Sequence, residues 1–155
     1  MDSGDPVDIV YLDFQKAFEK VPHQKLLITV SSHGRRGKVL SGFSNWLKDR
    51  KQKVEINGQF SEWGEVNCGV PQGSVLGPVL FNIIINDLEK GVNRKVAKLA
   101  DDTKLLSVVK SKVDCEELQR DFTKLGDWAT KWQMKFNVVK CKVMHIGKHK
   151  PNYTY

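Results

Sequence analysis

The segment covering residues 92–109 has the sequence VNRKVAKLADDTKLLSVV. Two strand-like runs, Val92–Leu99 and Thr103–Val109, flank the tripeptide Ala100-Asp101-Asp102. Apolar and β-branched runs on both sides of a short polar break are typical of two antiparallel strands joined by a tight turn. We therefore expect a β-hairpin with an acidic tip.

Further strands and a long helix surround this hairpin along the chain. Val7–Leu12 ends at Asp13 and Val143–Ile146 ends at Gly147, and the β-branched and aromatic character of both runs predicts strands. Between the hairpin and the last strand, apolar residues step by four, three, four and three positions, which predicts an amphipathic helix from Val113 to Trp132. These residues are Leu118, Phe122, Leu125, Ala129 and Trp132.

The segment between Pro22 and Gly91 is expected to connect the first strand to the hairpin. Helical patterns cover 23–30 and 37–50, and the apolar face of the second places Trp46 in a core. Asn57-Gly58 predicts a type I′ hairpin turn, since both positions of that turn require positive φ. A further helix carries Leu76, Val79, Leu80, Ile83 and Ile84, with Ser74 as its N-cap and Gly91 just past its end.

With this connection treated as one crossover, the order of elements is β-α-β-β-α-β, an α+β, ferredoxin-like fold. In that topology the first two strands run parallel, and the third lies antiparallel between them. The end of the first strand then lies beside the hairpin. Asp13, Asp101 and Asp102 are expected to meet in space.

Carboxylates gathered at one sheet edge repel one another unless cations lie between them. Their hard oxygen ligands suit Mg²⁺, and two such ions can activate a 3′-hydroxyl and stabilise a leaving pyrophosphate. The alternative is structural, because aspartate is also favoured in turns. From the residues alone, both interpretations of Asp101 and Asp102 stay open.

Composition predicts one folded, soluble domain over residues 1–155, since 40% of the residues are hydrophobic and 28% are charged. The net charge of +7 is concentrated in clusters that suit a polyanion, although basic faces are also common as plain solvated surface. The clusters are Arg35, Arg36 and Lys38; Lys48, Arg50, Lys51 and Lys53; and Lys140, Lys142, Lys148 and Lys150.

The cysteines and the N-terminus indicate the cellular compartment in which the protein is expected. Cys68, Cys115 and Cys141 are odd in number and far apart, which favours neither a disulfide framework nor a zinc site. The N-terminus has no apolar signal core, and no stretch is long enough to span a bilayer. We expect no membrane association and no secretion, and a nuclear or cytoplasmic location.

Four segments, in order along the chain, resemble the motifs of reverse transcriptases. Residues 11–18, YLDFQKAF, are similar to motif A, and residues 69–74, GVPQGS, to motif B. Residues 99–102, LADD, are similar to motif C, and residues 137–140 with 143–147 to motif D. The linking text resembles vertebrate LINE polymerases. The chain is thus identified as a member of the reverse transcriptases of LINE-type, non-LTR retrotransposons, specifically their palm region.

The resemblance implies a role for each matching residue. Asp13 and Asp101 would bind metal, Asp102 would help to hold the second of two Mg²⁺ ions, and the Phe14 carbonyl would complete the nucleotide-bound metal; Mn²⁺ would substitute. Phe18 would be the steric gate against a ribose 2′-hydroxyl, although the residue by itself is more often core. Lys140 would donate a proton to pyrophosphate. The substrate-binding loop would consist of Gly69, Pro71, Gln72 and Gly73.

The implied reaction is RNA-directed DNA synthesis, with an RNA template, a DNA primer and deoxynucleoside triphosphates as partners. Two positions depart from the family pattern: Glu19 replaces an aspartate, and Leu99 replaces the aromatic residue before Ala-Asp-Asp, which affects primer positioning. The chain begins just before motif A and ends after motif D, so we expect the fingers and the thumb to be absent. The alternatives are a catalytically silent palm that only binds nucleic acid, and a degenerate fragment.

The remaining candidates receive no catalytic role. The histidines show no ligand spacing and no nucleophilic partner; they are His23, His33, His145 and His149. Trp63, Trp128 and Trp132 could stack on bases, but their helical spacing favours core packing for the latter two.

Overall fold

The structure is a computed structural model, and it describes residues 4–148 and 151–155. It divides into two compact units. The first combines the chain up to Gln15 with Asn86–Tyr155, and the second is Lys16–Ile85. His149 and Lys150, discussed above, lie outside the described residues.

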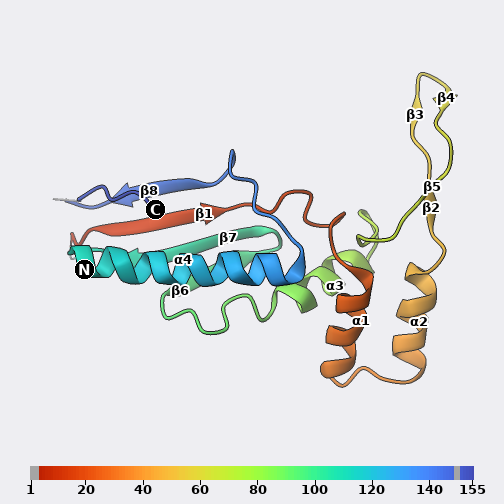
Figure 1. The fold of residues 1–155 in the computed structure, drawn as a ribbon, viewed down its shortest axis with the longest axis horizontal. Helices are drawn as coiled ribbons and strands as arrows, with labels where there is room; N and C mark the ends of the chain where they lie inside the picture. The colour runs from red at the N-terminus through yellow and green to blue at the C-terminus, as the bar shows by residue number, and fades with distance from the viewer. Residues whose placement is uncertain (1–3, 149–150) are drawn as a thin grey trace. The chain divides into compact units, whose positions relative to one another are not determined.

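The first unit is built on a four-stranded antiparallel sheet in the order β6-β7-β1-β8 (Figure 1). Its strands are β1 Val7–Leu12, β6 Lys95–Leu99, β7 Asp102–Val108 and β8 Lys142–Ile146. Both β1 and β6 are antiparallel to β7, which lies between them, so β1 and β6 are parallel to each other. The ferredoxin-like prediction is confirmed in element order and in strand direction.

One long helix, α4 Lys112–Trp132, covers a face of this sheet. The helix begins with a capping box, in which Ser111 Oγ accepts from the Asp114 N–H and the Asp114 carboxylate accepts from the Ser111 N–H. Its inner face buries Leu118, Leu125, Trp128, Ala129 and Trp132, which confirms the helix and the core role of the two tryptophans. Phe122, which was expected on the same face, is only half-buried. The sheet presents Asp8, Val10 and Leu12 from β1 as its buried residues.

The register of β1 places the candidate acids. Leu12 pairs with Thr103 on β7, so Asp13 leaves the strand beside Asp102. Asp102 pairs with Leu99 and belongs to β7 itself, whereas the turn consists of Ala100 and Asp101 alone. The turn is therefore one residue shorter than the expected three-residue tip, because Asp102 still pairs with Leu99 in the β6–β7 ladder.

The second unit contains three helices and two short hairpin-like ladders. The helices are α1 His23–Ser32, α2 Lys38–Leu47 and α3 Leu76–Ile85. The ladders pair β2 Lys51–Gln52 with β5 Gly64–Glu65, and β3 Glu55–Ile56 with β4 Gln59–Phe60. Ser74 Oγ accepts from the Gly77 N–H, which confirms Ser74 as a cap of α3.

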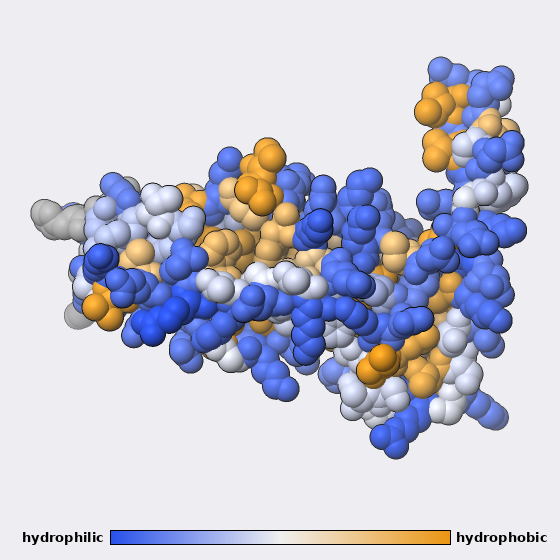
Figure 2. Space-filling model, viewed as in Figure 1, coloured by the Kyte–Doolittle hydropathy of each residue, from blue (hydrophilic) through white to orange (hydrophobic). Residues whose placement is uncertain are grey.

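The predicted turn at Asn57-Gly58 is confirmed, with φ of 50° and 79° at the two residues. The β3–β4 hairpin extends from the helices of its unit, and hydrophobic side chains lie exposed near its tip (Figure 2). They include Ile56 and Phe60, which are 67% and 55% exposed. Trp63 is also exposed, with Lys53 Nζ 5.2 Å from its ring centroid.

Two predictions for this unit are wrong in detail. Trp46 is only half-buried, and Leu47 is the sole fully buried residue of α2, because an apolar stripe does not by itself specify which of its residues contact a neighbour. The helix expected to run to Gly91 ends at Ile85, and turns fill the interval.

Among the described residues, no helix has both the length and the apolar character that a membrane span requires.

Candidate active site

Asp13 is held at the end of β1 by a short backbone pairing with the segment that follows α4. The Asn137 N–H donates to the Asp13 carbonyl at 2.8 Å, and the Gln15 N–H donates to the Lys135 carbonyl at 2.7 Å. The Phe14 ring stacks on Phe136, with 4.6 Å between the centroids. Residues 13–15 are therefore fixed by backbone hydrogen bonds on both sides of an aromatic pair in which Phe14 is buried and Phe136 is half-buried.

This pairing also determines where the Phe14 carbonyl points. Phe14 and Phe136 form a bridge whose hydrogen bonds come from the residues before and after them. In such a non-hydrogen-bonded pair, the polar groups of the paired residues point away from the partner strand. The Phe14 carbonyl is thus directed away from Phe136 and accepts neither hydrogen bond of this bridge.

Lys140 lies opposite Asp13. A turn brings it there, since the N–H groups of Lys140 and Cys141 both donate to the Asn137 carbonyl. Lys140 Nζ is 3.4 Å from Asp13 Oδ2. That contact is an ion pair only: Oδ2 is buried, and within the part of the chain that the structure describes no group makes a hydrogen bond to it.

Asp13, Asp102 and Lys140 line one cavity of about 420 Å³. Tyr11, Leu12, Thr103 and Lys104 complete its lining. Asp101 is at the turn and does not line this cavity, and Ala100 before it has a φ of 54°, a conformation that costs free energy in any residue with a Cβ. The expected meeting of carboxylates is therefore seen for Asp13 and Asp102.

A divalent cation fits the donors that are present. A buried carboxylate oxygen without a hydrogen bond is a costly group, and a cation would satisfy it. Asp13 and Asp102 line the cavity, and their carboxylates are hard oxygen ligands of the kind that Mg²⁺ and Mn²⁺ accept, whereas Phe14 is outside the cavity lining. Over residues 4–148 and 151–155, no group of three or more His, Cys, Asp or Glu side chains gathers to hold a metal.

One further charged residue of this cavity, Lys104, was not selected from the sequence. Lys104 faces Tyr11 across the β1–β7 ladder, with Nζ 5.1 Å from the ring centroid. Lys142 flanks Tyr11 on the other side, in β8. The alternation from Asp102 would have placed Lys104 on the same sheet face, and the cavity therefore combines acidic ligands with a basic rim.

In the second unit, the candidate gate and the motif B loop are joined. The Phe18 ring stacks on Phe81 of α3 at 4.8 Å, and the Phe18 carbonyl accepts from the Val70 N–H at 2.7 Å. Gly69 has a φ of 90°, and a Cβ there would lie 2.8 Å from the Glu19 carbonyl oxygen. Glycine at this position is thus required by both backbone conformation and space.

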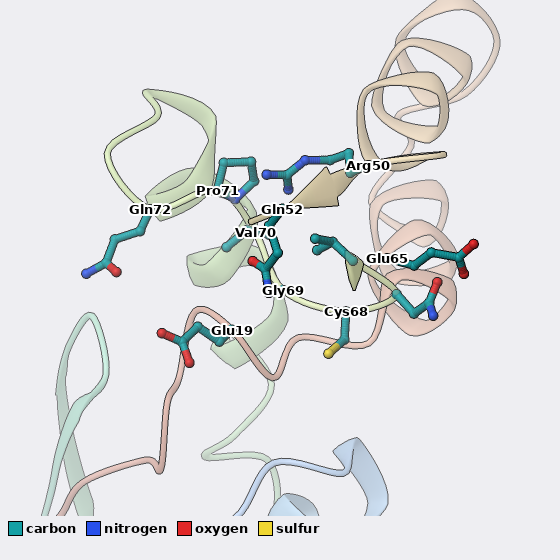
Figure 3. A pocket seen from close by; sticks show the side chains of 11 residues that line it. Glu19, Arg50, Gln52, Glu65, Cys68, Gly69, Val70, Pro71 and Gln72 are labelled. Atoms are coloured by element: carbon teal, nitrogen blue, oxygen red, sulfur yellow. The ribbon is translucent and has the colours of Figure 1, made fainter. Parts of the chain in front are cut away.

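The loop borders a second cavity, also of about 420 Å³ (Figure 3). Gly69, Pro71 and Gln72 line it from one side, and Arg50 and Gln52 of the β2 region from the other. Gln72 is exposed, and its side chain extends away from Arg50 and to the same side as Glu19 (Figure 3). Gly73 follows with a φ of 80°.

The histidines occupy more specific positions than their spacing indicated. His23 Nε2 lies 2.7 Å from the Gly69 carbonyl oxygen, a contact across 46 residues that no local pattern could reveal. His145 Nδ1 lies 2.6 Å from Oδ1 of the buried Asp8, and Tyr155 donates to the other oxygen of that carboxylate. Burial and the Asp8 carboxylate raise the pKa of Tyr155 above its ordinary value.

A sequence model of the family described as "Reverse transcriptase (RNA-dependent DNA polymerase)" matches residues 7–155. The RNA-directed DNA polymerase from mobile element jockey of Drosophila melanogaster is 32% identical over 142 residues, which are 84% of this chain and 15% of that protein. The probable RNA-directed DNA polymerase from transposon BS of the same species is 32% identical over 151 residues, covering 90% and 16% of the two chains.

Solved structures agree on the fold. Apo telomerase from Candida tropicalis, truncated from its C-terminal domain, superposes with a TM-score of 0.67 at 13% identity, over 95% of this chain and 32% of that one. The complex of that telomerase with a fragment of telomeric RNA gives a TM-score of 0.68 at 12% identity, over 97% of this chain and 28% of the other.

The chain spans about one sixth of the length of these curated relatives. Both are Drosophila proteins, and they do not support the expectation of a vertebrate-type element.

Proposed function

The chain belongs to the reverse transcriptase family, and from that premise we propose that it is the palm of an RNA-directed DNA polymerase encoded by a non-LTR retrotransposon. In this proposal the palm extends over residues 1–155, and the fingers and thumb that grip triphosphate and duplex are supplied by segments outside it. The partners are an RNA template, a DNA primer and deoxynucleoside triphosphates.

The observation that carries the proposal is the cavity shared by Asp13, Asp102 and Lys140. Asp13 Oδ2 is buried beside a lysine without a hydrogen bond, so the site holds a carboxylate whose negative charge is only partly compensated. A purely structural aspartate would be expected to accept hydrogen bonds from its surroundings. An oxygen kept available in this way suits a ligand.

Within the proposal, Asp13, Asp101, Asp102 and the Phe14 carbonyl hold divalent cations, Mg²⁺ by preference with Mn²⁺ as a substitute. Bound there, the cations would lower the pKa of the primer 3′-hydroxyl and neutralise charge on the leaving pyrophosphate. Lys140, 3.4 Å from Asp13, holds a proton at Nζ that it can donate to the pyrophosphate. Lys104 and Lys142 add positive charge near the same cavity, which favours a polyphosphate.

The second unit contributes substrate selection in this scheme. The Phe18 ring, backed by Phe81, excludes the 2′-hydroxyl of a ribonucleotide. Gln72 contacts the template and the incoming nucleotide, and Gly69, Pro71 and Gly73 shape the backbone that approaches them. Leu99, which is 78% exposed beside the acidic turn, would contact the primer end in place of an aromatic residue.

Two finer expectations accompany the proposal. The element is of the vertebrate LINE type according to its linking text, and the enzyme acts in the nucleus or the cytoplasm. Sequencing the reading frame on either side of this chain tests the first expectation. The fingers, thumb and further domains that the gene encodes can then be compared with those of vertebrate LINE elements. Localisation of the tagged full-length protein tests the second.

Primer extension on an RNA template with Mg²⁺ tests the function. The complete reading frame should extend the primer, its Asp101→Asn/Asp102→Asn variant should not, and Asp127→Asn, on the exposed side of α4, should behave as the parent does. The 155-residue chain alone should extend barely or not at all, because losing the groups that orient the reactants forfeits several kcal/mol. An inactive complete protein that still binds nucleic acid would favour the silent palm instead.

A further inference from the structure

The motif B loop is attached to the segment after motif A by backbone hydrogen bonds within the second unit. The Gly69 N–H donates to the Val21 carbonyl and the Val70 N–H donates to the Phe18 carbonyl, both at 2.7 Å. Pro22 and Cys68 form an isolated bridge beside these bonds. Gly69 is so close to the Glu19 backbone that a Cβ would overlap it. The attachment is therefore tight and begins at the candidate gate, Phe18.

His23 adds a side-chain contact to this attachment. Its Nε2 lies 2.7 Å from the Gly69 carbonyl oxygen, and because a carbonyl can only accept, Nε2 carries the proton and donates. His23 is the first residue of α1, whose inner residues Leu26 and Val30 are fully buried. The ring therefore extends from a helix that is anchored in its own core.

Together these contacts hold both polar ends of one peptide group. The peptide group between Gly69 and Val70 has its oxygen bound by His23 and its N–H bound by Phe18. Without His23, the Gly69 carbonyl oxygen would lose this hydrogen bond. The Gly69–Val70 peptide plane could then rotate, because glycine permits such rotation more freely than any other residue. Val70 precedes a proline, which restricts it to extended conformations. A rotation at Gly69 would thus be transmitted to Gln72.

We propose that His23 is a positioning residue for nucleotide selection: it fixes the Gly69–Val70 peptide group and thereby sets where Gln72 lies relative to Phe18. This role rests on the proposed polymerase function. His23 itself need not touch the nucleotide. Instead, it sets the relative positions of two groups that would touch the nucleotide, the Phe18 ring and the Gln72 side chain.

Two substitutions separate the hydrogen bond from simple packing. Glutamine places an N–H donor at about the same reach as Nε2, so His23→Gln retains the donor, whereas His23→Leu fills similar space without one. His33→Leu is the matched control, because His33 is the exposed C-cap residue of α1, with its Nδ1 2.8 Å from the Thr29 carbonyl oxygen at the opposite end of the helix from His23.

Hydrogen exchange of the 155-residue chain is the first test. In His23→Leu, the Gly69 and Val70 amides should exchange roughly fivefold faster, the effect of losing one ordinary hydrogen bond. His23→Gln should restore the parent rates, and the amides of the β1–β7 ladder should be unchanged in all variants. Parent rates at Gly69 and Val70 in His23→Leu, or faster exchange throughout the second unit that glutamine does not correct, would overturn the proposal.

Single-nucleotide kinetics in the complete polymerase is the second test. His23→Leu should raise KM for the correct deoxynucleotide several-fold and reduce the discrimination against ribonucleotides, with kcat nearly unchanged and with rescue by His23→Gln. Identical KM and discrimination in His23→Leu and the parent would overturn the positioning role. If the parent polymerase itself were inactive, the proposed function would fail, and the exchange experiment would still decide the role of His23 in the loop.

Discussion

Asp13 and Lys140 form an ion pair at the cation site that we propose. The lysine lies 3.4 Å from a buried carboxylate oxygen that has no hydrogen bond among the described residues. Lysine and a metal ion would compete for that oxygen, because both are cations. The balance between them can be changed one residue at a time.

We predict that Asp13→Asn weakens Mn²⁺ binding by roughly tenfold or more, since a charged ligand is lost. Lys140→Met should do the opposite and tighten binding, because it removes a positive charge next to the ion. Isothermal titration calorimetry measures both affinities, with Asp127→Asn as the control. Equal affinity in the parent and in Asp13→Asn/Asp101→Asn would show that the ion binds elsewhere.

Phe18 is the residue on which sugar selection depends in our proposal. Phe18→Val in the complete polymerase should admit ribonucleotides, because the ring that occupies the space of the 2′-hydroxyl is gone. Deoxynucleotide extension should largely survive, since the backbone bond from Val70 to the Phe18 carbonyl does not involve the side chain. Single-nucleotide primer extension gives the ratio of the two rates, and Phe60→Val, on the exposed hairpin, is the control. An unchanged ratio would remove Phe18 from the gate.

At the scale of the secondary-structure elements, a few backbone positions determine the conformation of the loops and helices and thereby the stability of the chain. Gly69→Ala should destabilise the chain by about 2 kcal/mol or more, because the new methyl group meets the Glu19 backbone at 2.8 Å and φ is positive. Gly42→Ala in α2 should stabilise it by about 0.5–1 kcal/mol, because that glycine is helical and has open space around it. Urea denaturation compares the two, and equal effects would contradict the close approach at Gly69.

Asp121 links α4 to the turn before β6. Its Oδ2 accepts from the N–H groups of Asn93 and Arg94, each at 2.9 Å, and its Oδ1 lies 2.7 Å from Lys124 Nζ. Burial opposes ionisation, but the hydrogen bonds from Lys124 and the two backbone groups outweigh it and hold the pKa of Asp121 below its usual value.

A depressed pKa in the folded state means that the unfolded chain takes up the proton first as the pH falls. The contribution of Asp121 to stability is therefore complete above about pH 4 and is lost as the pH drops through the folded pKa. Asp121→Asn should lower stability by about 1–3 kcal/mol at pH 7 and by less at pH 3. Urea midpoints at the two pH values provide the measurement, and a loss that is the same at both would argue against this carboxylate.

For the molecule as a whole, a positive net charge favours the approach of a polyanion. The chain carries a formal charge of +7, so it should bind a primer–template duplex weakly, with log K falling by about 0.7–0.9 per phosphate contact for each unit of log salt. Lys51→Gln/Lys53→Gln should reduce that slope by about two units if both lysines contact phosphates. Fluorescence anisotropy over a salt series measures the slope, and a salt-independent affinity would exclude a phosphate-dominated interface.

Much of this architecture followed from local pattern. Strand alternation, helical spacing and the Asn57-Gly58 turn predicted the element order, because these features depend on residues within a few positions of one another. The motif residues also identified the family, which the family match over residues 7–155 confirmed. Trp46 shows where such inference ends: its helical face was evident, but its half-burial depends on what α2 packs against.

By itself, the sequence determined the fold class, the family and the identity of the candidate ligands, since these follow from residue type, spacing and order. Only the tertiary structure decided that Asp102 and not Asp101 lines the cavity with Asp13, because one residue of strand register and a positive φ at Ala100 separate the two. It alone placed His23 on the Gly69 carbonyl, 46 residues away. Contacts of that kind require the folded path of the backbone, which no local pattern encodes.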